Sequence, residues 1–421
     1  MRNVEPARGF RDLDAAAKRT KEDLLSSIRS VYLQRGFTEI ETPVVEPIER
    51  LRDSDGGENT GMVFQVLRRG LTSADLAEAA DLSELCDLGL RYDLTVPLAR
   101  FVASNQGRLP EVFRSIQIGP VWRAERPQKG RYRQFTQCDI DIVGEASITA
   151  EIELILGTLA ALAAIGLSGA TVRLNDRRFL DALLADADVP VSLRPRTLII
   201  VDKLDKVGLD GVRKAIAELL PPASATRLSS RLQRFAEGGE EPTIGSFVGG
   251  LGVPIDPDVI AANTTILETV RLVSGATSIR FDPTLVRGLG YYTGPVFEVE
   301  HPASKSSVAG GGRYDNMIGK FLGRSVPACG FSLGFDRLME LAPLRSEDAN
   351  QRIAVVYEKH TSPSDLFTRQ RDLLASGTSV RLVRAARNTR RLFEDLAADG
   401  FQWFQRIDDP VDTRRSVKRE G

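Results

Sequence analysis

Residues 113–144 combine arginines and carboxylates in an order typical of two strands joined by a charged loop. The first strand leads into Arg123 and Glu125, and the return strand carries Asp139 and Asp141. An arginine side chain binds phosphate oxygens bidentately and keeps its charge at any working pH. The pattern therefore suits a nucleoside triphosphate bound beside a small polar or cationic ligand. The alternative is a solvated turn, which would not need these charged side chains within the strands.

The same segment resembles the second signature motif of class II aminoacyl-tRNA synthetases, in the form found in histidyl-tRNA synthetases. Four further segments resemble motifs of that family and follow the family's order. They are GFTEIETPVVEPI at 36–48 (motif 1), RGLGYYTGPVF at 287–297 and GGGRYD at 310–315 (the two histidine-specific motifs), and PACGFSLGFDRL at 327–338 (motif 3). Five ordered matches are far more specific than any single motif.

The resemblance implies a two-step reaction, in which ATP activates histidine as an acyl-adenylate and the adenylate is transferred to tRNA. ATP enters with Mg²⁺ as a substrate complex. We expect no tightly bound cofactor and no metal ion held by protein side chains. The implied ATP-binding residues are Arg123, Glu125, Arg131, Arg133, Phe135 and Arg337.

The motifs also imply a role for each of these side chains. Arg123 would hold the α-phosphate, and Arg287 would lie between the substrate carboxylate and that phosphate; these two are the implied catalytic residues. Glu125 would meet the adenine amino group, and Phe135 would stack on the adenine. Arg337 would hold the γ-phosphate. Arg131 and Arg133 belong to a loop implied to fold over the pyrophosphate and the adenylate.

Histidine recognition requires acceptors for the imidazole N–H groups and a counter-charge for the α-ammonium. By resemblance, the ammonium would lie among Asp93, Thr95 and Gln137. The plain alternative for residues 90–101 is a strand-to-helix turn capped by Asp93 or Thr95, and both interpretations can hold together. The ring would lie near Asp141, Tyr291 and Tyr292. Gly290 stands where many relatives have Asp, so no carboxylate role is assigned there.

Composition places the chain among ordinary soluble proteins. It has 421 residues, 27% charged and 42% apolar, with a formal net charge of -1. Any tRNA contact must therefore come from local basic patches rather than from bulk charge. No secretory signal is visible. The longest apolar run, 154–167, is too short to span a bilayer and is predicted to form a buried helix. We expect a cytoplasmic protein with no membrane contact, whose three cysteines are reduced packing residues.

Only two histidines occur, His301 and His360. A histidine-rich zinc site and a Ser-His-Asp triad are therefore poorly supported. Both histidines are expected at the surface. Adenylation by ATP needs no histidine, because ATP brings its own leaving group.

The family's organisation implies an α+β fold, with a class II synthetase-type antiparallel sheet flanked by helices, a helical insertion and a small C-terminal α/β domain. Residues 1–176 and 266–342 would form the catalytic domain. Residues 177–265 read as helical and polar, and would be the insertion that leans on tRNA. An amphipathic helix over 14–35 and the strand after it would form the interface of a homodimer.

Residues 351–421 alternate strands and helices, which is typical of a parallel or mixed sheet. They hold 14 Lys/Arg against 10 Asp/Glu, a local net of +4. The domain resembles a shortened anticodon-binding domain, and we expect its charged tail, 412–421, to be disordered. A basic cluster of this kind can be a solvated face, but beside the other motifs it favours contact with tRNA phosphates. Its candidate residues are Arg384, Arg387, Arg390 and Arg391.

Two alternatives to a histidine–tRNA ligase stay open. One is a non-catalytic, synthetase-like regulatory subunit of ATP phosphoribosyltransferase. Such relatives lack the Arg287 motif and the C-terminal domain, both of which occur here. The other is a paralogue that activates an amino acid for another carrier, or a binding module that only senses tRNA.

Overall fold

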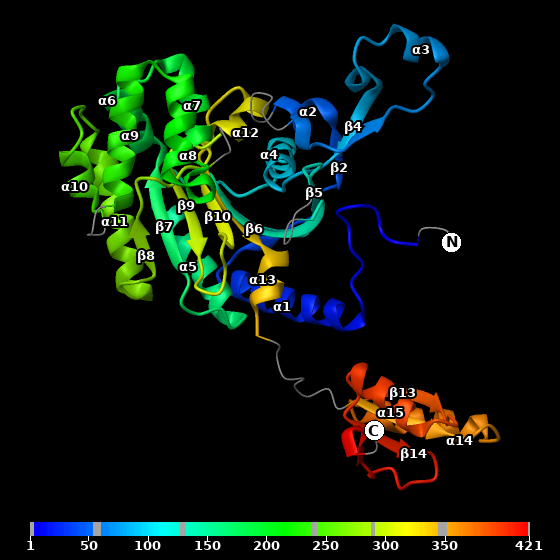
Figure 1. The fold of residues 1–421 in the computed structure, drawn as a ribbon. Helices are drawn as coiled ribbons and strands as arrows, with labels where there is room; N and C mark the ends of the chain where they lie inside the picture. Colours follow the sequence, from blue (N-terminus) through cyan, green and yellow to red (C-terminus); the bar gives the residue numbers. More distant parts are fainter. Residues whose placement is uncertain are drawn as a thin grey trace. The chain divides into compact units, whose positions relative to one another are not determined.

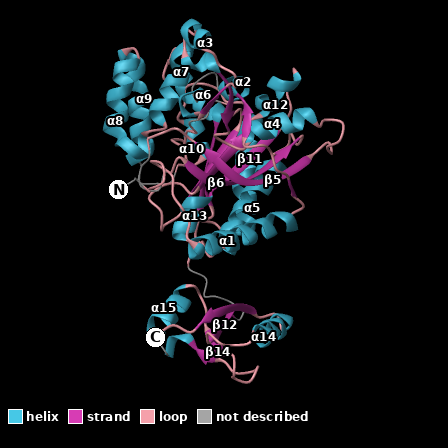
Figure 2. Cartoon of the chain, turned by 90° about the vertical axis from the view of Figure 1, so that its right-hand side faces the viewer, coloured by secondary structure: helices cyan, strands magenta, loops and turns pink. Residues whose placement is uncertain are grey.

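The computed structural model describes residues 4–53, 60–126, 132–237, 242–287, 291–343 and 352–419. The chain divides into two compact units. One comprises residues 1–11 and 24–342, and the other comprises residues 12–23 and 343–421. The first unit is built on a large sheet with helices around it, and the second on a small sheet with its own helices (Figures 1 and 2).

The first unit is organised around an eight-stranded sheet of order β1-β5-β6-β11-β10-β9-β7-β8. The five inner pairs are antiparallel, whereas β1 with β5 and β7 with β8, at the edges, are parallel. This confirms the expected α+β class. The strands are β1 (Thr38–Glu39), β5 (Phe113–Trp122), β6 (Gln134–Val143), β11 (Ala328–Gly334), β10 (Ala309–Arg313), β9 (Pro295–Glu300), β7 (Thr171–Asp176) and β8 (Ile279–Phe281).

The long β5–β6 hairpin separates apolar from polar side chains by the alternation of a β-strand. On β6, Cys138, Ile140 and Ile142 are fully buried in the main apolar core. That core also contains residues of α1 (Ala15–Gln34) and α5 (Thr149–Ala164). The opposite face of β6 carries the odd-numbered residues of 137–141, all of them polar. The strand therefore has one face for the core and one for a ligand.

The longest apolar run in the sequence forms α5, a helix that is buried along most of its length. The prediction of a buried helix there is confirmed. Across the described ranges, no helix combines the length and the apolar composition needed to cross a membrane.

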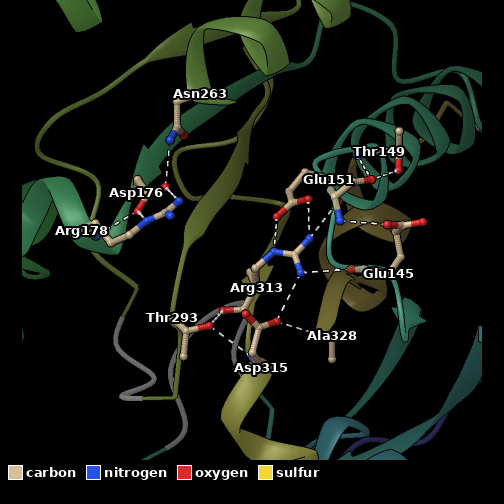
Figure 3. Close-up of polar contacts among 11 residues, drawn as sticks. Glu145, Thr149, Glu151, Asp176, Arg178, Asn263, Thr293, Arg313, Asp315 and Ala328 are labelled. Atoms are coloured by element: carbon tan, nitrogen blue, oxygen red, sulfur yellow. Dashed lines mark hydrogen bonds and ion pairs between the residues drawn. The ribbon is translucent and has the colours of Figure 1, made fainter. Parts of the chain in front are cut away.

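A helical block follows β7, as predicted for 177–265, and its last helix continues to Ser274. The helices are α6 (Arg177–Asp186), α7 (Arg194–Val201), α8 (Leu204–Leu219), α9 (Pro222–Glu237), α10 (Ile244–Gly249) and α11 (Pro257–Ser274). Buried Asp176, at the end of β7, caps α6 and accepts hydrogen bonds from Arg178 and from Asn263 of α11 (Figure 3). These contacts attach both ends of the block to the sheet.

A separate three-stranded sheet has the order β2-β4-β3. Its neighbouring helix α4 follows the tight turn at Asp93, whose Oδ1 accepts a hydrogen bond from Val96 N at 3.1 Å. The strand-to-helix turn predicted there is confirmed. The elements are β2 (Val45–Pro47), β3 (Gln65–Leu67), β4 (Cys86–Leu90), α2 (Ile48–Asp53), α3 (Ser73–Glu78) and α4 (Thr95–Ser104). The remaining helices of the first unit are α12 (Asp315–Leu322) and α13 (Phe335–Leu341).

The second unit contains a four-stranded sheet of order β13-β12-β14-β15. Its elements are β12 (Arg352–Tyr357), α14 (Pro363–Ala375), β13 (Ser379–Arg384), α15 (Thr389–Ala398), β14 (Trp403–Arg406) and β15 (Arg415–Ser416). The prediction that 412–421 is disordered is wrong for residues 415–419. β15 pairs with β14, and Val417 is fully buried beside Phe393 and Phe404. The strand pairing and the burial of Val417, the one apolar residue of the tail, hold this part of it against the small sheet.

Candidate functional site

The polar face of the large sheet forms the floor of a cavity of about 800 Å³. Side chains from β6, β9, β10, β11, α13 and the segment before α4 line it. Most of the site residues predicted from the sequence meet in this one cavity. They are Asp93, Thr95, Arg123, Glu125, Phe135, Gln137, Asp141, Arg287, Tyr291, Tyr292 and Arg337.

Of the predicted ATP-binding residues that the structure describes, Arg133 alone does not line the cavity. Arg133 turns its guanidinium to the Glu125 and Arg8 carbonyls, at 3.1 and 3.4 Å. It therefore braces the end of the hairpin. Arg131 lies outside the described residues, as does Gly290.

One end of the cavity gathers three carboxylates, those of Asp93, Asp139 and Asp141. Each is no more than 4% exposed, and each has one oxygen without a hydrogen-bond partner among the described residues. Burial raises the pKa of Asp93 to about 6 and that of Asp141 to about 7. Burial and the neighbouring Asp141 raise the pKa of Asp139 well above its usual range. This end is built for a cation or for several N–H donors.

The position of Asp141 is fixed from two sides. Tyr314 donates its hydroxyl hydrogen to Asp141 Oδ1 at 2.6 Å. Burial and the same carboxylate raise the pKa of Tyr314 well above its usual value, which keeps it a donor. On β11, Gly330 lies beneath the carboxylate, where an added Cβ would come within 2.0 Å of Oδ1. Only glycine leaves room for Asp141 there.

The other part of the cavity is cationic. Arg123 lies over the Phe135 ring, with its guanidinium carbon 5.1 Å from the ring centroid. Its Nε donates to the Tyr92 carbonyl at 3.1 Å. Arg337, near the start of α13, donates to the Ser307 carbonyl at 2.6 Å. A ring and two arginines in one cavity can hold a base and the phosphates of one nucleotide.

Arg287 is held between β9 and β10. Its Nη1 lies 3.5 Å from Glu298 Oε1, and its Nε has no partner among the described residues. An added Cβ on Gly310 would come within 2.4 Å of that Nη1. The guanidinium therefore packs directly against the first glycine of GGGRYD. A side chain at this position would block so close an approach.

The arginine of the same motif has a different task. Arg313 forms two hydrogen bonds with Glu151 of α5, at 2.6 and 2.8 Å (Figure 3). Its own carbonyl accepts from Thr293 N at 2.8 Å, and the Thr293 hydroxyl accepts from Asp315 N at 3.2 Å. This buried pair thus anchors the segment that directly follows Tyr291 and Tyr292 in the chain.

Sequence reasoning placed Asp139 only generally, among the carboxylates of the return strand, and assigned no role to Ser332, Tyr314 or Glu298. All four line the cavity. The two-residue period of β6 was an available signal for Asp139, because Gln137 and Asp141 point to the same face. No sequence signal distinguishes Ser332, which reaches the cavity through the register of β11 against β6.

The two histidines differ in their surroundings. His360 is exposed, as expected. His301 is half-buried and lines the cavity, with Nε2 3.2 Å from the Ser168 carbonyl. The expectation of a surface position therefore fits His360 better than His301.

Comparisons with known proteins show the family of the chain. The family model for histidyl-tRNA synthetase matches residues 9–338. The chain belongs to the histidyl-tRNA synthetase family. A histidine–tRNA ligase of Leifsonia xyli subsp. xyli is 48% identical over 411 residues, covering 96% of this chain and 95% of that relative. A probable histidine–tRNA ligase of Tropheryma whipplei is 38% identical over 426 residues, covering 96% of both chains.

Two solved structures share the fold. An ATP phosphoribosyltransferase regulatory subunit/histidyl-tRNA synthetase from Bacillus halodurans superimposes with a TM-score of 0.75 at 23% identity, covering 96% of this chain and 97% of the other. A histidyl-tRNA synthetase from Nostoc sp. PCC 7120 gives a TM-score of 0.72 at 24% identity, covering 96% and 91%. At these identities the likeness supports the fold class alone.

The arginines predicted to bind tRNA lie in the second unit. Arg384, Arg387 and Arg391 are exposed and form no ion pair with any described residue. Arg390 pairs with Glu394, with Nε 2.9 Å from Oε1. Three of the four arginines are therefore available to an anionic partner.

We expect Asp141→Asn to change how the stability of the ligand-free protein depends on pH. The folded-state pKa of Asp141 is raised from 3.8 to about 7, so the folded protein holds this proton more tightly than the unfolded chain. The resulting stability is present below about pH 4 and is lost as the pH rises towards 7. Asparagine does not titrate and can still accept the hydrogen bond from Tyr314.

Thermal unfolding of both proteins from about pH 4 to about pH 8 measures this linkage. Across that range the Tm of the wild type should fall relative to the Tm of the variant by at least about 2–4 °C. Such a shift corresponds to roughly 1 kcal/mol in the free energy of unfolding. Asp258→Asn, at an exposed position of α11, is the control. A Tm difference that stays constant or grows in favour of the wild type at high pH would contradict the linkage.

Proposed function

We propose that the protein is a histidine–tRNA ligase. It activates L-histidine with ATP, releases pyrophosphate, and transfers the histidyl group from the adenylate to the 3′ end of tRNA-His. The observation that carries the proposal is one cavity that is lined both by the buried carboxylates Asp93, Asp139 and Asp141 and by Arg123, Arg287 and Arg337. An amino acid and a nucleoside triphosphate can meet there, with the α-carboxylate of one beside the α-phosphate of the other.

The first step is a displacement at phosphorus. A carboxylate oxygen of histidine attacks the α-phosphorus of ATP, and the bond to the bridging oxygen of pyrophosphate breaks. Arg123 and Arg287 stabilise the charge that develops on the α-phosphate oxygens. Arg337 holds the γ-phosphate, and Phe135 and Glu125 hold the adenine. Mg²⁺ enters with ATP and neutralises the departing pyrophosphate.

The carboxylate end recognises the amino acid. Asp93, Thr95 and Gln137 hold the α-ammonium, and Asp141 with Tyr291 and Tyr292 surrounds the imidazole. A site built to hydrogen-bond its substrate rejects analogues that leave its buried polar groups unpaired. The unpartnered oxygens of Asp93, Gln137 and Asp141 support this assignment.

The parts outside the cavity serve tRNA and assembly. The helices from 177 to 265 form an insertion that leans on tRNA, between two parts of the catalytic domain, 1–176 and 266–342. Residues 351–421 form a shortened anticodon-binding-like domain that contacts tRNA phosphates through its free arginines. The helix α1 and the strand after it form the interface of a homodimer.

A regulatory subunit of ATP phosphoribosyltransferase has less support. The residues that adenylation needs, Arg123, Arg287 and Arg337, all line the cavity. A purely regulatory protein would have no need of all three.

The proposal predicts pyrophosphate exchange into ATP that depends on histidine and on Mg²⁺. The measurement is exchange by the purified chain with each amino acid in turn, followed by charging of purified tRNA. Exchange driven by another amino acid, or by none, would refute the assignment. Exchange with histidine but no charging of tRNA would instead favour the paralogue that serves another carrier.

A second prediction concerns Arg287→Ala. Because the guanidinium acts mainly on charge that develops in the transition state, kcat for exchange should fall about 100-fold, or roughly 3 kcal/mol. The KM for ATP should change much less. Arg280→Ala is the control, since Arg280 bonds Asp282 and Glu300 and does not line the cavity. A normal kcat with only a raised KM would show plain ground-state binding.

A third prediction concerns the second unit. Replacing Arg384, Arg387 and Arg391 together by Gln should raise the KM for tRNA and leave histidine-dependent exchange unchanged. Phosphate binding by arginine gives a steep salt dependence, so the slope of log affinity against log salt should fall by about one for each arginine that no longer binds a phosphate. Lysine at the same three positions is the matched control and should keep most of the slope. Equal charging by the Gln variant would place the tRNA-binding surface elsewhere.

A further inference from the structure

We propose that Asp139 and Ser332 are positioning residues that fix the orientation of the Gln137 amide. They do so by a chain of hydrogen bonds that leaves the amide oxygen, rather than the amide nitrogen, facing the bound ammonium group. The inference rests on the proposed function, in which Gln137 holds the ammonium of histidine. It adds two residues that would affect the affinity for histidine and that are not among the proposed ATP-binding residues.

The three residues are brought together by strand register. Asp139 of β6 lies directly opposite Ser332 of β11, and Gln137 is the next residue on the same face of β6. Gln137 Nε2 donates to Ser332 Oγ at 2.7 Å. The Ser332 hydroxyl faces the Asp139 carboxylate across this residue pair and acts on it as a donor that lowers its pKa. Gln137 Oε1 and Asp139 Oδ1 are buried and have no partner among the described residues.

The direction of this chain follows from the chemistry of its members. An ionised carboxylate only accepts hydrogen bonds, so the single hydroxyl hydrogen of Ser332 goes to Asp139. The Ser332 oxygen is then an acceptor, and it takes an N–H from Gln137. With the amide reversed, Gln137 Oε1 and Asp139 would compete for one hydrogen. The carboxylate thus sets an orientation that Gln137 could not keep alone.

The charged groups around Asp139 influence whether its carboxylate is ionised, and the proposed orientation of Gln137 requires the ionised form. Asp141 on the same strand and Asp93 before α4 face it, and together with burial they raise its pKa. The hydrogen bond from Ser332 and the charge of Arg123 act in the opposite direction. Arg91 and Tyr32 also interact with it electrostatically. An ammonium bound at the unpartnered oxygens would favour the ionised form that the hydrogen-bond chain requires.

Replacing Asp139 by Asn makes the prediction sharp. The new amide has one donor and one acceptor end. If its NH₂ faces Ser332, the hydroxyl reverses and Gln137 presents its own NH₂ to the ligand. If its oxygen faces Ser332, the Asn NH₂ occupies the place of Asp139 Oδ1. In either case a donor faces the ammonium, and one unit of negative charge is removed.

The test compares two ligands that differ in the ammonium group. Histidinol carries the ammonium and the imidazole, and imidazole-4-propionate carries the imidazole without an ammonium. Binding of each is measured by calorimetry to the wild type, Asp139→Asn, Ser332→Ala and the double variant. Ser115→Ala is the control, because Ser115 is a buried serine opposite Asp141 on β5 that does not line the cavity.

We expect Asp139→Asn and Ser332→Ala each to weaken histidinol at least about tenfold, which corresponds to about 1.4 kcal/mol. Binding of imidazole-4-propionate should stay within about twofold, a difference of roughly 0.4 kcal/mol. Because both residues act through one chain, the double variant should lose less than the sum of the two single losses. The KM for histidine should rise while the KM for ATP stays unchanged.

Equal weakening of both ligands would show a general structural role and would overturn the inference, as would unchanged histidinol binding. Additive losses would also overturn it, because they would mean that Ser332 does not transmit the effect of Asp139. Ser332→Ala keeps the test decisive if Asp139→Asn does not fold. A wild type that exchanges pyrophosphate without histidine would refute the proposed function itself. A wild type that requires histidine, with unaffected variants, would refute the inference alone.

Discussion

The site depends on burying charge on one face of a sheet while the other face completes the apolar core. On β6 this is achieved by strict alternation, with Ile140 turned to the core and Asp139 and Asp141 turned to the cavity. Buried carboxylate oxygens without partners are costly, and the raised pKa values of Asp93 and Asp141 reflect that cost. A ligand whose cationic and N–H groups pair with these oxygens removes that cost. Affinity and selectivity for such a ligand therefore have the same physical origin.

Close approach of charged side chains to the backbone is the second constraint. The guanidinium of Arg287 rests on Gly310, and the carboxylate of Asp141 rests on Gly330. These glycines lie on neighbouring antiparallel strands, β10 and β11. A side chain at either position would displace the charged group above it. The glycines of GGGRYD and PACGFSLG thus create the space in which the charged groups sit.

Much of this could be predicted from the sequence, because the motifs fix residue types at set spacings on strands. The hairpin at 113–144 and the strand-to-helix turn at Asp93 are local, and local patterns predict them. Ser332 could not be predicted, since its place depends on the register between β6 and β11. The tail was predicted to be disordered because of its charged composition. Val417 is buried because β15 pairs with β14, and the local sequence pattern does not indicate that pairing.

The arginines of the two histidine-specific motifs have different surroundings in the structure. In the first, Arg287 lines the cavity, where it pairs with Glu298 and interacts with Tyr292, while its Nε has no partner among the described residues. In the second, Arg313 is saturated by Glu151 and by nearby carbonyl groups, so it cannot serve a ligand without breaking a buried ion pair. Removing one partner of such a pair typically costs about 3–5 kcal/mol. Two arginines of similar prominence in the sequence therefore differ in the structure: Arg287 keeps an unpartnered Nε in the cavity, and Arg313 fastens β10 to α5.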